Sequence, residues 1–370
     1  MKKPVGILFL ALAASVTTRG QVSITADDMF NQVGLYYLAY SNPYDPTSLS
    51  PTPWAVPTTL IGNPGASNIW DFSTGPADVT LRFDYLSATN AAFASVASTF
   101  PQATIVEQQT NLTDTNAPAQ DLFFSWPANS ARTVFGYYAD DPNSDNTANP
   151  FDTPIQDFPA TMSYGQTWST TAQWENSQAG IPIQYIQVAD FKVDAYGTIV
   201  LPSEFGGVFG PGIRLREADT TTVNADFGTG SGFEYVETDY NLVYRWLMPG
   251  RGIVAELSSI QSSQAMPPDN FTQATHFQRM FQTNHKPAST NTGGCTSPDP
   301  VTDLKIRVSN GQALLSWSKA NCATQYRLDY SSTPADPTSW MPLTTVTNQL
   351  LALDSISTNS TRFYRVVSIK

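Results

Sequence analysis

One twelve-residue stretch, 141–152, reads DPNSDNTANPFD and spaces its oxygen-bearing side chains as a calcium loop would. The candidate ligands are Asp141, Asn143, Asp145, the Thr147 carbonyl and Asp152. Calcium takes about six to eight oxygens from a flexible loop, and Asn146 stands where an EF-hand has its glycine. Pro142, Pro150 and the lack of a bidentate glutamate count against binding. A structural calcium site and a solvated loop without metal both stay open.

Other catalytic patterns are scarce in this chain. Its two histidines, His276 and His285, stand outside any metal-ligand motif, and the sequence has no nucleophile elbow or phosphate loop. A glycosidase needs only two carboxylates across a cleft, and five glutamates are candidates: Glu175, Glu204, Glu217, Glu234 and Glu237. No catalytic residue or cofactor is assigned, and a carbohydrate-active hydrolase with an Asp/Glu pair is the first alternative function.

Aromatic residues suggest a binding function instead. An exposed aromatic ring can stack on the apolar face of a sugar, which is how many sandwich domains hold polysaccharide. Most tryptophans in such a domain belong to the core. Trp54 in a proline-rich stretch, and Trp168 and Trp174 in GQTWSTTAQWEN, are the expected exceptions and therefore the candidate ligand-binding residues.

The elements that must position these residues are strands. Short runs rich in Val, Ile, Thr, Tyr, Phe and Trp alternate with turn residues, as in 79–86, 121–126, 133–139 and 240–248. Asp outnumbers Glu by 24 to seven, which also favours turns over helices. Only 90–100 is expected to form a short helix, capped by Asn90. The prediction is an all-β chain with a large β-sandwich or jelly roll followed by a small sandwich.

The expected organisation has four parts. Residues 1–20 form a secretory signal peptide, with Lys2 and Lys3 before a short apolar run. Residues 22–262 form the large β-domain, 263–297 a linker or strap, and 298–370 the small domain. Within the linker, 271–282 is expected to be either a last strand of the large domain or a strap lying on it. DAYGT at 194–198 is expected to make a tight turn into a strand.

Export and charge limit the partners. Without the signal peptide the chain carries 31 acidic against 16 basic residues, a formal charge of −15. Nucleic acid is not expected as a partner, because phosphate binding relies on clustered Lys and Arg. No later segment is long and apolar enough to span a membrane. The expected location is outside the cell or on its surface, with the periplasm as the alternative.

The C-terminal part resembles a fibronectin type III domain. A proline-rich entry at PDPVTDLKIRV, Trp317 in the second strand, alternating QYRLDYSS and a last RFYRVVSI carry this resemblance. It implies a small β-sandwich, but the chain ends after the sixth expected strand, so an exposed edge could support self-association. Cys295 and Cys322 are the only cysteines, and an exported pair closing a loop of about 28 residues favours a disulfide over two free thiols.

The N-terminal part resembles the uncharacterised β-domain of a broad group of bacterial secreted, cell-surface proteins. The motifs are WDFS at 70–73, DAYGT followed by GIRLRE, and YRWLM at 244–248. The resemblance implies architecture and location but no activity. Trp70 and Phe72 are expected in the core, with Asp71 capping the turn.

Together these features predict a secreted, non-catalytic protein that serves adhesion or binds a polysaccharide or other polymer. The second alternative is a structural component of an extracellular assembly.

Overall fold

A computed structural model confirms the all-β class, with twenty-two strands and only three short helices among the residues that it describes. None of the described helices has the length and apolar character that a bilayer crossing requires. The described residues are 22–43, 53–114, 117, 119–140, 147–202, 209–285, 298, 300–301, 304–309, 312–317, 320, 323–334, 336, 338–347, 350–356 and 361–369.

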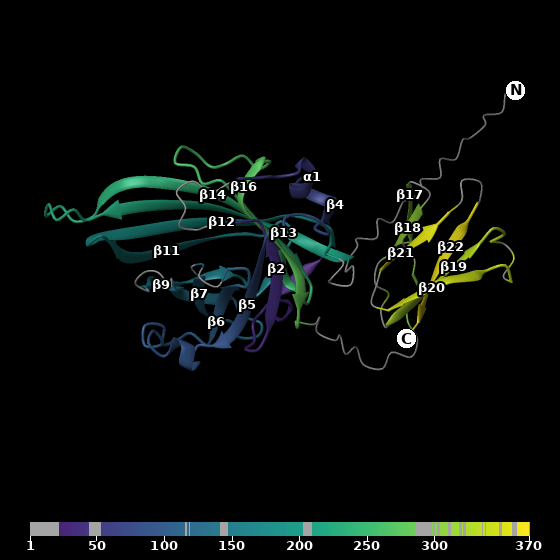
Figure 1. Ribbon diagram of the computed structural model, residues 1–370, viewed down its shortest axis with the longest axis horizontal. Helices are drawn as coiled ribbons and strands as arrows, with labels where there is room; N and C mark the ends of the chain where they lie inside the picture. Colours follow the sequence, from purple (N-terminus) through teal and green to yellow (C-terminus); the bar gives the residue numbers. More distant parts are fainter. Residues whose placement is uncertain are drawn as a thin grey trace, which may run out of the picture.

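One continuous sheet builds the large unit (Figure 1). Its first half, in the order of hydrogen-bonded neighbours, is β11 (Thr167–Gln178), β12 (Ile181–Val200), β13 (Phe209–Ala225), β14 (Glu234–Met248), β15 (Gly252–Ser259) and β16 (Gln273–Thr283). The second half follows as β2 (Tyr36–Ser41), β5 (Val79–Ser87), β6 (Ile105–Asn111), β7 (Ala119–Ser125), β8 (Arg132–Asp140) and β9 (Thr147–Phe158). The pairings along this order are antiparallel.

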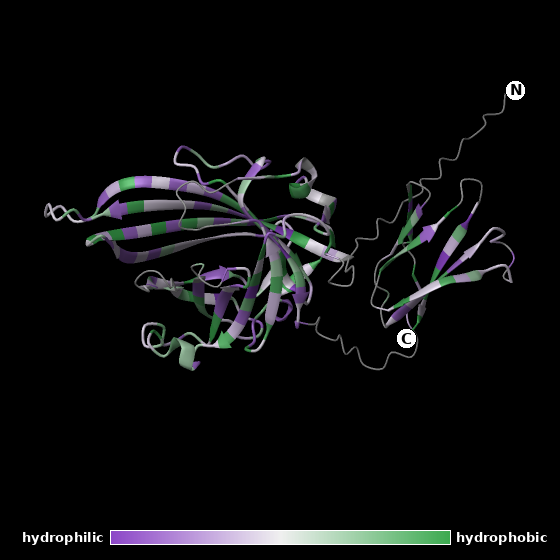
Figure 2. Cartoon of the chain, in the orientation of Figure 1, coloured by the Kyte–Doolittle hydropathy of each residue, from purple (hydrophilic) through white to green (hydrophobic). Residues whose placement is uncertain are grey.

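The sheet folds over so that its two halves face each other as the layers of a sandwich. Strands β11–β14 form one layer and β5–β9 the other (Figure 1). Hydrophilic and hydrophobic residues alternate along the long strands (Figure 2). Most of the buried apolar side chains of this unit make one large core, and a smaller cluster gathers around Phe93, Phe100 and Phe123. The two ends of the sheet meet where Trp168 donates from Nε1 to the Asp157 carbonyl, 2.8 Å away, and Gln173 donates to Asp152 at 2.6 Å.

Small elements complete the large unit. Strand β4 pairs in parallel with β12, and β3 pairs with β16. Strands β1 and β10 pair with each other. Their bounds, with those of the short helices, are β1 (Ser23–Thr25), η1 (Ala26–Asp28), β3 (Trp54–Ala55), α1 (Thr58–Ile61), β4 (Gly65–Asp71), η2 (Ala91–Phe93) and β10 (Thr161–Ser163).

The expected turn at DAYGT is wrong. The whole stretch Ile181–Val200 is the single strand β12, and a bulge between Val193 and Ala195 takes up the irregularity. Gly197 is needed for another reason. A Cβ atom there would lie 2.2 Å from the Asn68 carbonyl oxygen, so glycine allows β4 to approach the strand.

Two further predictions are refined. The stretch 271–282, expected as a strap or a last strand, forms the strand β16, which is hydrogen-bonded between β15 and β2. This part of the expected linker 263–297 therefore belongs to the large sheet. The expected helix at 90–100 is limited to the 3₁₀ turn η2. Its cap is confirmed, because the Asn90 side chain accepts from the Ala92 amide at 3.0 Å, and Phe93 and Phe100 are buried.

The C-terminal part forms two three-stranded antiparallel sheets with their own core. Trp317 is buried directly after the second strand of this part, 5.5 Å from the ring of Tyr326 between centroids. The first sheet has the order β17 (Lys305–Ser309), β18 (Gln312–Ser316) and β21 (Leu351–Ser355), and the second has β20 (Met341–Thr347), β19 (Gln325–Ser331) and β22 (Phe363–Ile369).

Candidate functional site

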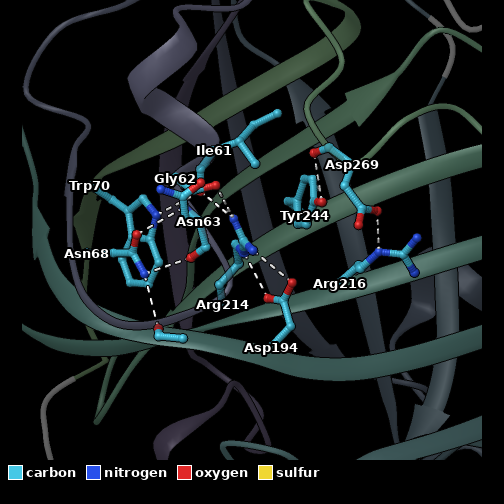
Figure 3. A network of polar contacts seen from close by, with 11 residues as sticks. Ile61, Gly62, Asn63, Asn68, Trp70, Asp194, Arg214, Arg216, Tyr244 and Asp269 are labelled. Carbon is cyan, nitrogen blue, oxygen red and sulfur yellow. Dashed lines mark hydrogen bonds and ion pairs between the residues drawn. The ribbon is translucent and has the colours of Figure 1, made fainter.

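The three motifs of the large unit meet around one buried arginine, Arg214 on β13 (Figure 3). Its Nε and Nη2 donate to the two carboxylate oxygens of Asp194, at 2.8 and 2.7 Å. Its Nη1 donates to the carbonyl oxygens of Ile61 and Gly62. The bulge of β12 turns Asp194 toward this arginine, so the ion pair joins the DAYGT and GIRLRE motifs to the end of α1.

The other two motifs join the same cluster (Figure 3). Trp70 donates from Nε1 to the Ile61 carbonyl at 3.0 Å, and the Arg214 guanidinium lies 4.6 Å from the ring centroid of Tyr244. Trp70 and Phe72 are fully buried, and Asp71 accepts from the Ser73 amide at 2.9 Å, so their expected core and capping roles are confirmed. Through these contacts the cluster fixes β4 and α1 on the sheet.

A cavity of about 330 Å³ lies inside the sheet and is a different kind of site. Strands from both halves of the sheet line it. Its buried lining includes Tyr85, Arg132 and Glu217, whereas Gln109 and Gln187 are half-buried and Gln120 is exposed. The other charged lining residues, Glu107, Asp157, Arg245 and Glu256, are half-buried as well. We call the six charged groups the floor of the cavity, and Gln109, Gln120 and Gln187 its rim.

Arg132 on β8 supplies one charged group of the floor. Its Nε lies 2.9 and 3.1 Å from the two carboxylate oxygens of Asp157 on β9, and its Nη2 also contacts that carboxylate. The guanidinium lies 4.5 Å from the ring centroid of Phe158 and 5.3 Å from that of Trp126. Aromatic rings thus hold the planar cation in place while the carboxylate neutralises it.

Arg245 on β14 supplies the second cation and is shared by two carboxylates. Its Nε lies 2.6 Å from Glu256 Oε2, and its Nη1 makes an ion pair with Glu217. Burial alone would raise the pKa of Glu256, but Arg245 and then His276 outweigh burial, and the pKa is lowered. Glu256 therefore stays ionised in the cavity wall.

Glu107 on β6 has a neutral partner instead. The Tyr85 hydroxyl donates to Glu107 Oε2 at 2.7 Å. Burial raises the pKa of Glu107, although Arg132 and this hydrogen bond offset part of the effect. Glu107 and Glu256 thus line one cavity with pKa values displaced in opposite directions from the ordinary one.

His276 and Gln278 on β16 complete the polar wall. Burial lowers the pKa of His276, with Glu256 and Gln278 acting in the opposite direction, so the imidazole is neutral near pH 7. The Gln278 side chain hydrogen-bonds to Tyr37 and to His276. The cavity therefore offers both donors and acceptors at fixed positions in a low-dielectric interior.

An open groove of about 700 Å³ runs outside the place where β9 and β11 meet. Ile155 and Thr170 line both this groove and the cavity. Its walls carry amide and hydroxyl side chains, together with Pro154, Pro159 and the ring of Trp168. The Trp168 ring stacks on Phe191, with centroids 5.0 Å apart and an interplanar angle of 8°.

The three predicted ligand-binding tryptophans are not brought together in one site. Trp168 lines the groove. Trp54 is partly buried on β3 and stacks on Phe277 at 4.7 Å between centroids. Trp174 is only 8% exposed and stacks on Tyr185, so the expected exposed ring is wrong for this residue.

The predicted calcium ligands fall mostly outside the described residues, which exclude Asp141, Asn143 and Asp145. The other two lie on β9, where Asn149 donates to the Thr147 carbonyl at 3.1 Å and Gln173 donates to Asp152. Where residues are described, no three His, Cys, Asp or Glu side chains gather as a metal site. The predicted signal peptide and the pair Cys295 and Cys322 also lie outside the described residues.

Of the glutamates considered from the sequence, Glu217 lines the cavity, whereas Glu175, Glu234 and Glu237 are exposed and Glu204 lies outside the described part of the chain. Sequence reasoning missed Glu107 and Glu256. Both stand at inward positions of alternating strands, as in EQ at 107–108 and GIVAELSS at 252–259. Glu107 is in phase with the buried Ile105, which is a signal that alternation offers, whereas Glu256 stands between the buried Ala255 and Leu257 and gives no such signal.

Comparison with known proteins gave no match, whether with protein-family models, curated proteins or solved structures.

Proposed function

We propose that this is a secreted, non-catalytic protein that binds polysaccharide chains in the groove outside β9 and β11. The observation that carries the proposal is the place of Trp168, a partly exposed aromatic ring in an open groove with uncharged polar walls.

Trp168 is held rigidly, which favours binding. One face of its ring rests on Phe191, and its Nε1 is anchored on the Asp157 carbonyl. A ring fixed before binding loses little conformational entropy when a ligand arrives. Stacking on the C–H face of a sugar requires such a fixed aromatic surface.

The groove chemistry matches a neutral, hydroxyl-rich polymer. Asn129 and Gln156 offer amides, and Ser130, Ser169 and Thr171 offer hydroxyls, each able to donate and accept hydrogen bonds with sugar hydroxyls. The groove is open to solvent, so a chain can enter it from the side without threading. None of the described lining residues is Asp or Glu, which favours binding over hydrolysis in this groove.

A specific observation also favours the second alternative, a structural component that self-associates. Exposed apolar side chains lie on the edge strands of the two small sheets, β17, β20, β21 and β22. These side chains are Ile306, Val308, Met341, Leu353 and Phe363. Edge strands with exposed apolar residues invite pairing between chains, and sedimentation velocity across a concentration series tests for it.

The test of the proposed function is retention of the purified mature chain on insoluble polysaccharides, with and without calcium. Trp168→Ala is expected to weaken binding roughly tenfold or more, the equivalent of about 1.4 kcal/mol. Trp340→Ala is the matched control, since this partly exposed tryptophan lies in the C-terminal part beside Arg365. Retention lost with Trp54→Ala but kept with Trp168→Ala would move the site to β3. No retention on any polymer would overturn the proposal.

A further inference from the structure

We propose that the interior cavity is a second binding site, separate from the groove, for a small uncharged molecule rich in hydroxyl groups, such as a single sugar unit. The inference does not depend on the proposed polymer binding, because different side chains carry it.

The gathering of so many charged groups, two of them buried and four half-buried, needs an explanation beyond folding. Ion pairs in a protein interior are often no more stabilising than apolar residues of the same volume, because desolvation offsets their attraction. Yet the floor of this cavity contains two guanidiniums and four carboxylates, contributed by strands far apart in the sequence. These groups are Arg132, Arg245, Glu107, Asp157, Glu217 and Glu256. They are arranged around space that a ligand can fill.

The charges favour an uncharged ligand. Arg132 pairs with Asp157, and Arg245 pairs with Glu256 and Glu217, so the cations are neutralised within the wall. Glu107 accepts a hydrogen bond from the neutral Tyr85 hydroxyl, none of the described arginines is in direct contact with it, and burial raises its pKa. An anionic ligand would have to displace one of these carboxylates from its arginine, whereas a neutral ligand leaves the pairs in place.

The same groups favour hydroxyls. A hydroxyl donates one hydrogen bond and accepts others, and a carboxylate paired with one arginine still has free lone pairs. Gln278 stands in the wall and Gln109, Gln120 and Gln187 at the rim, and an amide can both donate and accept. Acceptors and donors are therefore both present in the cavity lining, and sugar hydroxyls use both.

Aromatic walls supply the complementary apolar surface. Tyr37 and Phe83 stack with centroids 4.3 Å apart, and both line the cavity together with Tyr85 and Trp126. The C–H faces of a sugar pack on such rings. At about 330 Å³ the cavity is far larger than a single water molecule needs, so it has room for a small molecule.

The test is isothermal titration calorimetry on the intact chain at pH 7. Glucose, galactose, mannose, N-acetylglucosamine and inositol are the neutral probes, and ethylammonium and propionate the charged ones. Saturable binding of at least one neutral probe is expected, with no binding of the charged probes. Glu107→Gln is expected to weaken that binding at least tenfold. Glu175→Gln is the matched control, because it makes the same change at an exposed position on β11 and is expected to shift affinity less than twofold.

A second variant covers the case in which Glu107→Gln fails to fold. Gln187→Ala removes a half-buried amide at the rim, and it is expected to weaken binding at least threefold while the circular dichroism spectrum is unchanged. Binding of ethylammonium or propionate in place of the neutral probes would overturn the assignment to an uncharged ligand. The absence of binding by every probe, or binding unaffected by both variants, would overturn the site itself. Polymer retention through Trp168 is expected to survive both variants.

Discussion

Arg214 and Asp194 form a two-pronged ion pair with side chains only 1% and 4% exposed. Residues 194 and 214 belong to separate motifs on β12 and β13, and the pair forms because the bulge after Val193 points Asp194 to the face of the sheet that carries Arg214. Arg214 then holds the end of α1 through two carbonyl oxygens. The motifs of the large unit thus form a buried contact that holds α1 against the sheet.

Asp194→Asn is expected to destabilise the large unit by about 3 to 5 kcal/mol, because it leaves the Arg214 charge buried and uncompensated. Urea denaturation followed by tryptophan fluorescence measures this change. Asp269→Asn is the matched control, since Asp269 pairs with Arg216 at a position where its side chain is 62% exposed. Its cost is expected to stay below about 1 kcal/mol. Equal effects of the two variants would contradict a special role for the buried pair.

Gly197→Ala is expected to detach β4 from β12. The new methyl group would lie 2.2 Å from the Asn68 carbonyl oxygen, which is backbone and cannot rotate away. Crowding of this kind costs about 1 to 3 kcal/mol. Amide hydrogen exchange should become faster across 65–71 and stay unchanged across β7. Thr198→Ala, which removes atoms from the neighbouring position, should leave the exchange of β4 close to that of the native chain.

Asp219 on β13 is expected to make stability depend on pH. Burial, with a smaller contribution from Glu256, raises its pKa from 3.8 to about 7. The folded chain therefore keeps the proton up to about pH 7, whereas the unfolded chain releases it near 3.8. Between these values the folded state binds more protons, so the stability linked to Asp219 is fully present below about pH 4 and falls as the pH rises through 7.

The change that tests this linkage is Asp219→Asn, which cannot lose a proton. Urea midpoints should show the variant more stable than the native chain at pH 8, by roughly 1 to 3 kcal/mol, with the advantage absent at pH 4. Asp190→Asn on the exposed side of β12 provides the comparison. If Asp219→Asn raised the urea midpoint by the same amount at pH 4 and pH 8, titration of Asp219 would not be the cause.

The predicted disulfide between Cys295 and Cys322 can be examined by mass spectrometry. Alkylation of the unreduced, denatured chain should label neither cysteine, and alkylation after reduction should label both. Closing a loop of about 28 residues stabilises by roughly 3 kcal/mol, so reduction should lower the melting temperature of the C-terminal part. Labelling of both thiols without reductant would show that they are free.

Much of the strand pattern can be predicted from the sequence. Alternation of apolar and polar residues at 79–86 predicts a strand, and β5 runs from Val79 to Ser87. The same reasoning fails at 194–197, where turn-forming residues stand inside one long strand. At Asp194 a bulge turns the side chain toward Arg214. At Gly197 the close approach of β4 leaves no room for a Cβ atom. Both reasons involve segments that are distant in sequence.

The cavity is harder to predict for a related physical reason. Strand β14 is buried on both faces between Leu242 and Met248, so its hydropathy does not distinguish the inward from the outward face. The sequence pattern therefore does not predict on which face of β14 the Arg245 side chain lies. Its partners Glu217 and Glu256 come from neighbouring strands, whereas Glu107 and Asp157 reach the cavity only because the sheet folds over. Pairing over such distances is not encoded in local spacing.

The meeting of β9 and β11 has a consequence for how such a molecule can diversify. Sheets joined by backbone ladders change width only in steps of one strand, about 4.8 Å. Here the two ends of the sheet are held by side chains, among them Phe151 against Trp174 and Gln173 against Asp152. Single substitutions along that line can therefore widen or narrow the interior in small increments. A lineage built on this fold can change the volume of its interior without gaining or losing a strand.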